Sequence, residues 1–266
     1  MRLGPSETSA ASFTTAAQNV RGHYDGGGRY VDGGASRDRE LRFDVRAIAK
    51  IGRSVQVGTI VPYVRTERKF AESSGVGSGV GDITVLGRYD FVRVGGQNGW
   101  PGIALTFALT LPTGRSPARA RDALGTDVTG TGTWEAKPGI AIERIWWTGW
   151  FVSGAASLGL FGPSTRAEGG TVALGPRFVA LLAAGKSFTN GFSFALGATH
   201  EQEAAPRADG LRVGASRART SALGFIGYEL DGHWQLLASL LVDFAGREQL
   251  ATTTIGFGIR RAWNVY

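Results

Sequence analysis

Apolar and polar side chains alternate at every second position along much of the chain. In residues 103–111, Leu105, Phe107 and Leu109 share one parity, and small residues such as Thr106 share the other. The same alternation recurs in residues 40–51, 83–91, 134–143, 235–244 and 255–260. Successive side chains of a β-strand point to opposite faces, so this period of two predicts strands with one apolar face. No segment shows a helical period with capping residues, and the chain is predicted to be nearly all β.

The pattern divides the chain into about twelve strands, judged by the period-two criterion. Their expected ranges are 12–24, 38–51, 55–68, 82–94, 102–112, 133–144, 150–161, 171–184, 192–200, 221–230, 235–244 and 251–265. Most are longer than an average globular strand and suit the roughly 9–11 residues that a tilted transmembrane strand needs. We predict an all-β fold, a single closed antiparallel transmembrane β-barrel over residues 12–266, with an N-terminal extension over residues 1–11.

The connections between these strands alternate between short turns and long loops. Short turns are expected at Gly52–Ser54, Gly95–Pro101, Ile145–Gly149, Lys186–Gly191 and Asp231–Trp234. Long, polar, glycine-rich loops are expected at residues 25–37, 69–81, 113–132, 162–170, 201–220 and 245–250. Barrels of the bacterial outer membrane have short periplasmic turns and longer extracellular loops. The pattern therefore predicts an outer-membrane protein, and an even number of strands leaves both termini in the periplasm.

Most tryptophans lie in or beside the expected short turns or near the C-terminus. They are Trp100, Trp146, Trp147, Trp150, Trp234 and Trp263. Aromatic rings concentrate where a membrane meets water, so we predict that these residues form one interface girdle and that Trp134 lies at the opposite rim. The alternative is that they cap the core of a soluble barrel.

Residues 145–162 carry no charged side chain and are long enough for one membrane-spanning helix. Their glycines, the turn signal at Thr148 and Gly149, and the alternating strands on either side favour two strands joined by a turn.

The glycines of residues 77–81 are spaced as in a phosphate-binding loop. Such a loop leads into a helix, whose N-terminus binds the phosphate. Here the strand pattern of residues 83–91 follows instead, and we interpret the glycines as a loop that opens a strand.

Closure of the barrel determines which face of the sheet contacts lipid and which faces the lumen. In hydrocarbon every backbone N–H and C=O group must be paired within the protein, so a spanning sheet closes on itself. The apolar parity then faces lipid and the charged parity faces the lumen. The candidate lumen residues are Arg42, Asp44, Arg46, Lys50, Asp82, Arg88, Asp90, Glu135, Lys137, Glu143, Arg177 and Arg260. We predict that they line a pore; the alternative is that they pair across strands and fill the lumen.

Composition restricts the chemistry further. The chain carries a formal charge of +7, but its arginines alternate with acidic residues and form no basic run, so we expect no nucleic-acid partner. It has no cysteine, and His23, His200 and His233 stand apart in the sequence. We therefore expect no metal site, no cofactor and no catalytic residues.

Two neighbouring segments resemble a known family. "GVGDITVLGRYDF", residues 79–91, begins with Gly-Asp before a strand that ends in Tyr-x-Phe, and "PGIALTFALTLPTG", residues 101–114, ends in Leu-Pro-Thr-Gly. This pair resembles the outer-membrane barrels of the phenol-degradation meta-pathway transporter family. The resemblance implies an outer-membrane protein that is a passive channel for small or aromatic compounds. It implies no catalytic residues. The excess of arginine among the lumen candidates separately favours anionic solutes.

We expect a monomeric passive channel whose partners are a small-molecule solute, outer-membrane lipid and lipopolysaccharide. Arginines in residues 201–220 are candidates for contact with lipopolysaccharide phosphates. One alternative is a structural or surface-binding barrel without an open pore. Another is an outer-membrane lipid hydrolase, but such enzymes place His and Ser two residues apart on a strand, a pair that this sequence lacks. The first residues lack the apolar segment of a signal peptide, so we expect that it was removed or that the start is misassigned.

Overall fold

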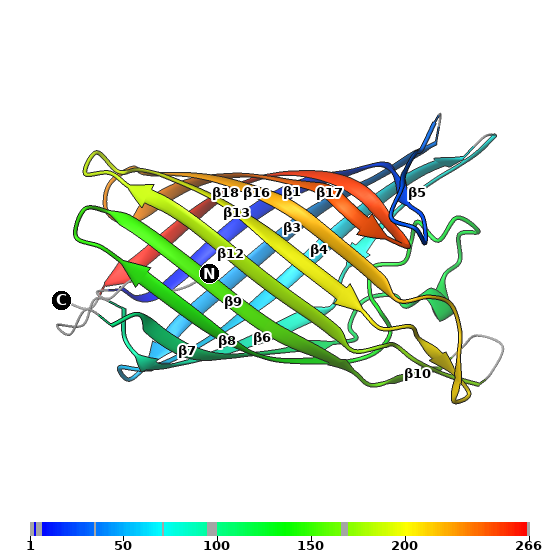
Figure 1. Ribbon diagram of the computed structural model, residues 1–266, viewed down its shortest axis with the longest axis horizontal. Helices are drawn as coiled ribbons and strands as arrows, with labels where there is room; N and C mark the ends of the chain where they lie inside the picture. Colours follow the sequence, from blue (N-terminus) through cyan, green and yellow to red (C-terminus); the bar gives the residue numbers. More distant parts are fainter. Residues whose placement is uncertain are drawn as a thin grey trace.

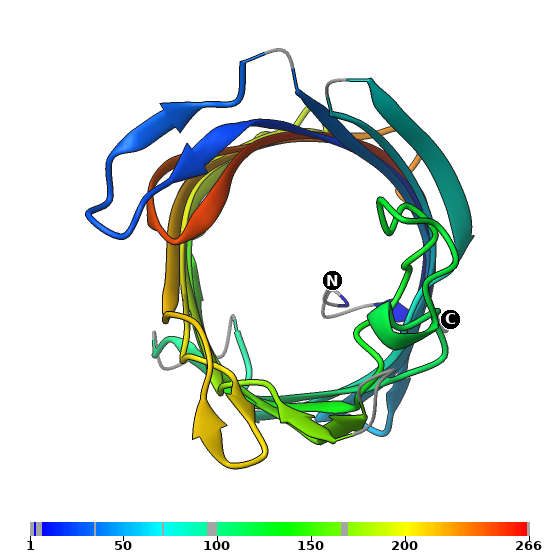
Figure 2. The same cartoon turned by 90° about the vertical axis from the view of Figure 1, so that its right-hand side faces the viewer.

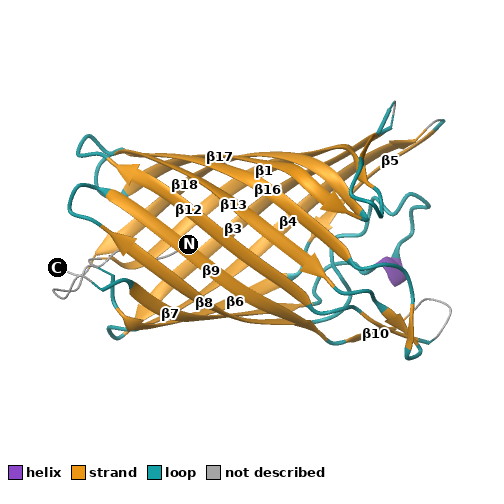
Figure 3. Ribbon diagram, in the orientation of Figure 1, coloured by secondary structure: helices purple, strands orange, loops and turns teal. Residues whose placement is uncertain are grey.

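The computed structural model describes residue 3 and residues 7–34, 36–70, 72–94, 100–165 and 170–264. Most of these residues lie in antiparallel strands, and Figure 3 shows one short helix, Pro117–Arg119, in a loop. The strands curve into a closed ring around a central lumen (Figures 1 and 2). The predicted closed, antiparallel all-β barrel is confirmed.

Twelve strands form the wall. In chain order they are β1 (Glu7–Tyr24), β3 (Arg37–Ile51), β4 (Val55–Phe70), β6 (Ile83–Val92), β7 (Gly102–Leu111), β8 (Glu135–Ile145), β9 (Trp150–Phe161), β12 (Arg177–Ser187), β13 (Phe192–Glu203), β16 (Arg217–Glu229), β17 (Trp234–Arg247) and β18 (Gln249–Asn264). Neighbours in this order pair with each other, and β1 also pairs with β18 from Glu7 opposite Asn264 to Tyr24 opposite Gln249. This last pairing closes the ring. The first strand begins at Glu7, within the segment for which the sequence predicts an extension.

The two ends of the barrel have connections of different length. Short connections join wall strands at residues 52–54, 146–149, 188–191 and 230–233. Because Glu7 lies opposite Asn264, the wall begins and ends at the same end as these turns (Figure 1). We call it the short-turn end, and the opposite end the loop end. Residues 95–99 of the turn predicted at Gly95–Pro101 lie outside the described residues.

The connections at the loop end contain additional short strands. β2 (Tyr30–Asp32) pairs with β1. A separate four-stranded sheet consists of β10 (Pro163–Thr165), β11 (Thr171–Ala173), β14 (Arg207–Ala208) and β15 (Leu211–Arg212). The loops predicted at residues 25–37, 162–170 and 201–220 are therefore connections at this end that contain short strands of their own.

β4 changes its pairing partner at Pro62. Residues 55–60 pair with β6, whereas residues 63–70 pair with β5 (Ser73–Val80). Pro62 has no N–H group to donate to a neighbouring strand, and its carbonyl accepts a hydrogen bond from Gly81 at 2.8 Å. Most of the loop predicted at residues 69–81 is thus a strand that continues β6 toward the loop end.

The prediction of a long loop at residues 245–250 is wrong. β17 and β18 reverse at Glu248 alone, whose backbone has a φ of 50°. The two strands pair with each other up to Val242 opposite Thr253. Next to this last pair, the Asp243 carboxylate accepts hydrogen bonds from the hydroxyl of Ser221 at 2.6 Å and from the backbone N–H of Thr252 at 2.8 Å. Its side chain thereby connects β16, β17 and β18 inside the wall.

The strand predicted at residues 171–184 starts too early. Its first residues belong to β11 of the small sheet, and the wall strand starts only at Arg177. Pro176 stands between the two and has no N–H group for a strand partner.

The outward parity of the wall is apolar and exposed. Val45 is 56% exposed and Leu196 is 67% exposed. On the inward parity, Asp44 and Glu135 are each 6% exposed. A soluble barrel shows the reverse arrangement, with an apolar interior and a polar surface, so that alternative does not describe this molecule.

Residues 145–162 include the last residue of β8, a turn and the whole of β9. β8 ends at Ile145, the turn has Gly149 at a φ of 84°, and β9 begins at Trp150. The helical alternative for this stretch is wrong. In the part of the chain that the structure describes, no helix has the length and apolar character to cross a membrane.

Leu105→Arg should lower the free energy of unfolding by about 2–4 kcal/mol, because Leu105 is exposed on the outward face of β7 and a charge there would enter lipid. Thr106→Arg is the matched control, since Thr106 points inward and should cost much less. Equilibrium unfolding in lipid vesicles, followed by tryptophan fluorescence, measures both variants. Equal costs would contradict the outward orientation of Leu105.

Candidate functional site

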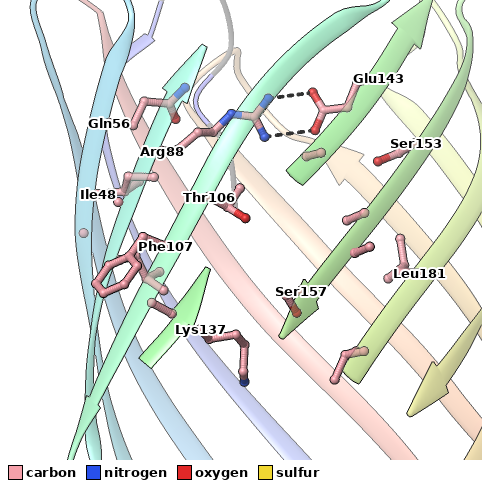
Figure 4. Close-up of a pocket in the computed structure, with 18 residues that line it drawn as sticks. Ile48, Gln56, Arg88, Thr106, Phe107, Lys137, Glu143, Ser153, Ser157 and Leu181 are labelled. Carbon is pink, nitrogen blue, oxygen red and sulfur yellow. Dashed lines mark hydrogen bonds and ion pairs between the residues drawn. The ribbon is translucent and has the colours of Figure 1, made fainter. Parts of the chain in front are cut away.

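The lumen contains a cavity of about 370 Å³. Its lining comes from β3, β4, β6, β7, β8, β9 and β12, and includes the side chains of Ile48, Gln56, Arg88, Lys137, Glu143 and Leu181 (Figure 4). Small residues such as Ala155 and Ser157 on β9 leave this space open. Pockets for small molecules have volumes of about 300–1,000 Å³, so the cavity is large enough for a small organic compound.

Arg88 on β6 belongs to a hydrogen-bonded network that joins three strands beside this cavity. Its Nε donates to Asp90 at 2.8 Å, and its two terminal nitrogens each lie 3.2 Å from a carboxylate oxygen of Glu143 (Figure 4). The contact with Glu143 crosses β7, where the small, fully buried Ala104 lies opposite Asp90 and leaves room for it. Asp90 also accepts a hydrogen bond from Gln56 at 3.0 Å. A bidentate arginine–carboxylate pair has one preferred geometry, so this network fixes the side chains on one side of the lumen.

A second set of ion pairs runs around the wall closer to the loop end. The pairs are Lys137–Glu135 at 3.3 Å, Arg177–Glu135 at 2.7 Å, Arg177–Glu201 at 3.5 Å and Arg219–Glu201 at 2.6 Å. Together they connect β8, β12, β13 and β16. Glu135 reaches Arg177 across β9 because Gly159, which lies between them, has no side chain; a Cβ atom there would collide with the Glu135 carboxylate.

Four more of the lumen candidates belong to two further groups. Asp44 lies between Arg42 and Arg46 on β3, with an oxygen 2.8 Å from a nitrogen of each. Arg260 on β18 contacts both carboxylate oxygens of Glu7 on β1. The candidates are thus divided among several groups of ion pairs and do not gather at one point.

The inward parity of the next strands is apolar in the middle of the wall. Leu181 lines the cavity from β12. On β16, Leu223 and Phe225 share the parity of Arg219, and Leu223 lies opposite Leu241 of β17. The middle of the lumen therefore has a charged side on β3 to β8 and an apolar side on β12 to β17.

The loop between β7 and β8, residues 112–134, packs on a face of β5 that has no side chains. We call it the mouth loop. β5 has glycine at every second position: Gly75, Gly77 and Gly79. A Cβ atom at Gly77 would lie 2.6 Å from backbone atoms of Thr126 and Asp127, so glycine is required for the loop to lie this close. Figure 2 shows the mouth loop within the outline of the ring at the loop end.

Carboxylates hold the mouth loop in this position. Asp127 accepts a hydrogen bond from the backbone N–H of Arg121 at 3.0 Å and another from the Arg115 guanidinium at 2.6 Å. These contacts lower the pKa of the Asp127 carboxyl to about 2. Asp82, at the junction of β5 and β6, accepts a hydrogen bond from the backbone N–H of Gly114 at 2.9 Å and so anchors the loop to the wall.

Leu3 lies on the inner side of the wall. Its side chain is buried beside Ala10 and Ile48. Its backbone N–H donates to Gln56 Oε1 at 3.1 Å, and Gln56 in turn contacts Asp90. The interior near the short-turn end is therefore partly filled by this residue.

The tryptophans proposed for an interface lie at the short-turn end. Trp146, Trp147 and Trp150 surround the β8–β9 turn, Trp100 precedes β7, Trp234 begins β17 and Trp263 lies near the end of β18. Cations lie over four of these rings: Arg144 over Trp146, Lys186 over Trp150, and Arg261 over Trp234 and Trp263, at 5.1–5.3 Å from the ring centres. Trp134, by contrast, immediately precedes β8 at the loop end.

Four members of the ion-pair network were missed by sequence analysis: Glu7, Gln56, Glu201 and Arg219. Glu201 and Arg219 fall within the loop predicted at residues 201–220, although β13 runs to Glu203 and β16 starts at Arg217. The alternation of charged and small residues continues through both segments and is the signal that would have extended the two strands. Gln56 is neutral, so the charge pattern did not mark it.

One family model, described as "Putative MetA-pathway of phenol degradation", matches residues 8–259. The match covers the wall from the start of β1 almost to the end of β18. No curated protein matches the sequence.

Several solved structures have a similar fold. An outer membrane channel from Pseudomonas putida F1 aligns with a TM-score of 0.84 at 17% identity, over 98% of this chain and 97% of that chain. The translocator domain of the autotransporter NalP from Neisseria meningitidis aligns with a TM-score of 0.57 at 12% identity, over 98% and 90%. The toluene transporter TbuX from Ralstonia pickettii gives 0.50 at 10% identity, over 98% and 90%. At these identities the similarity shows the fold alone.

Gly77→Val should displace the mouth loop, because the new side chain would overlap the backbone at Thr126. An overpacking cost of about 1–3 kcal/mol corresponds to a rise of roughly five- to 150-fold in the open form, and trypsin cleavage after Arg119 or Arg121 should accelerate accordingly. Ser74→Val is the control, since Ser74 lies on the opposite face of β5. Equal cleavage rates in the two variants would contradict the packing of the loop on the glycine face.

The mouth loop should remain in place in mild acid. The pKa of Asp127 is lowered, so its carboxylate stabilises the loop above its ordinary pKa of 3.8, and the contribution is lost as the pH falls through about 2. The chain has no cysteine, so a single spin label at Ala120→Cys reports the loop alone. We expect its spectrum to be unchanged from pH 7 to about pH 3 and mobile at pH 7 when Asp127→Asn is added. Mobilisation already around the ordinary pKa would contradict this assignment.

Proposed function

The chain belongs to the family described as the putative MetA-pathway of phenol degradation, and from that membership and its hollow barrel we propose that it is a passive outer-membrane channel for small molecules. The cavity within the closed wall carries the proposal, because a barrel that served only as a membrane anchor could fill its interior with side chains. Barrels of this strand number fall between filled eight-stranded barrels and the wide porins of 16–18 strands. The solute is therefore small.

The two sides of the lumen suit solutes with an apolar body and a polar group. The apolar side can contact an aromatic ring through Leu181, Leu223 and Phe225, while the charged side offers hydrogen bonds. Among the described residues, seven cationic and six carboxylate side chains take part in these four groups of ion pairs, which gives the groups one net positive charge. Because carboxylates pair with these cations, the net positive charge of the groups is small. We therefore expect a mild preference for anions and permeation by neutral compounds.

The same proposal assigns roles to the predicted residues. The pore-lining set is Arg42, Asp44, Arg46, Arg88, Asp90, Glu135, Lys137, Arg177 and Arg260. The tryptophans of the short-turn end lie at the periplasmic membrane interface, supported by the cations over their rings. Both ends of the wall then lie on the periplasmic side, the barrel is a monomer, and its outward face contacts outer-membrane lipid and lipopolysaccharide.

Two observations favour the alternative of a barrel without an open pore. Leu3 is buried on the inner side of the wall and bonded to Gln56, and the mouth loop lies within the ring. A lumen narrowed at both ends would make the protein a structural or surface-binding barrel. Solute flux distinguishes the two functions.

Ala155→Trp should slow solute entry into proteoliposomes at least about twofold, because Ala155 borders the cavity and a tryptophan there would occupy much of it. Val152→Trp is the matched control on the outward face of β9. The measurement is the rate of osmotic swelling in small neutral solutes after equal insertion of both variants. Unchanged swelling in Ala155→Trp relative to wild type would contradict passage through this cavity.

A further inference from the structure

A group of cations lies on the outward face of β3 and β4 at the loop end. It consists of Arg37, Arg39, Arg65 and Lys69, all exposed, and we call it the basic patch. The register brings the residues together, with Arg37 opposite Lys69 and Arg65 opposite Leu41. Four cations thus lie within a few residues of one another on two adjacent strands.

The basic patch borders the apolar surface directly. Its residues share the outward parity of Phe43, Val45, Val61 and Tyr63, all on the same two strands. Phe43 and Tyr63 lie opposite each other, with ring centres 6.4 Å apart. Arg65 is two residues beyond Tyr63, which is about 7 Å along an antiparallel strand. An acyl chain against the aromatic pair would therefore place its head group at the patch.

On six other wall strands the outward residue nearest the loop end is uncharged. These residues are Ile83, Leu111, Ala136, Leu160, Phe178 and Ala218. Arg247, beside the β17–β18 reversal, is a single cation and contacts the Ser216 hydroxyl at 3.4 Å. Attraction to a uniformly anionic surface does not require cations to cluster at one place, whereas the binding of one localised anion does.

The cations of the patch are not neutralised within the described residues. Glu67, opposite Arg39, is the one carboxylate among them in the register, and no ion pair joins it to any of the four. The four cations have only one carboxylate among them and therefore repel one another. An anion that binds between them relieves this repulsion.

We infer that the basic patch binds the phosphate groups of a membrane lipid whose acyl chains lie on the adjacent aromatic and aliphatic side chains. Arginine offers planar pairs of N–H groups that match phosphate oxygens, and the three arginines and one lysine of the patch suit a doubly charged phosphomonoester. Continuity with the apolar surface selects a lipid over free phosphate. The inference rests on the membrane placement of the proposed function and not on conduction through the lumen.

The test is titration of the detergent-solubilised full chain with bisphosphorylated lipid A, with the same lipid lacking both phosphates, and with inorganic phosphate, each followed by native mass spectrometry. Wild type should bind the bisphosphorylated lipid at least about tenfold more tightly than the phosphate-free lipid. Arg39→Gln combined with Arg65→Gln should abolish that difference. Arg144→Gln combined with Arg261→Gln, which removes two cations from the short-turn end, should retain it.

Three results would overturn the inference. They are a retained phosphate preference in the Arg39/Arg65 double variant, an equal loss in the Arg144/Arg261 control, and inorganic phosphate binding as tightly as the lipid. Heat-dependent electrophoretic mobility checks that each variant is folded, and Arg37→Gln with Lys69→Gln replaces the first pair if it is not. Because binding is measured in detergent without solute flux, failure of the channel function leaves this result unchanged.

Discussion

Pairing of every backbone polar group within the wall is the constraint on which the rest of the structure depends. An unpaired N–H or C=O group in hydrocarbon costs several kcal/mol, and a sheet with two free edges would leave a row of them. The pairing of β1 with β18, from Glu7 to Tyr24, removes both edges. Once the ring is closed, each strand has one side toward the surroundings and one toward the lumen, and alternation assigns every side chain to one of them.

Glycine and alanine positions shape the lumen as much as the charged side chains do. Gly77 lets the mouth loop approach β5, Gly159 lets Glu135 reach Arg177, and Ala104 leaves room for the contact between Arg88 and Glu143. Each of these positions lies on the inward parity next to a long charged residue or a loop. The cavity exists because, within the described part of the chain, the small residues of β9, such as Ala155 and Ser157, have no long charged side chain or loop packed against them.

Alternation alone predicted the wall strands, since a period of two over many residues has few other physical causes. It did not predict their register, and register decides that Arg177 meets Glu135 and Glu201 rather than other carboxylates. Strand ends were predicted less well than strand positions: β12 starts only after Pro176, while β17 and β18 run on to a reversal at Glu248. The mouth loop could not be placed from sequence, because its position depends on contacts between Asp127, Asp82 and segments far away in the chain.

The central claim is that the lumen is a continuous path for small molecules. Single-channel recording of the refolded wild-type protein in a planar bilayer, under a salt gradient, tests it most directly. The account predicts discrete conductance steps with a mild preference for anions. Silence from protein whose insertion has been verified would contradict it and would leave a closed, structural barrel.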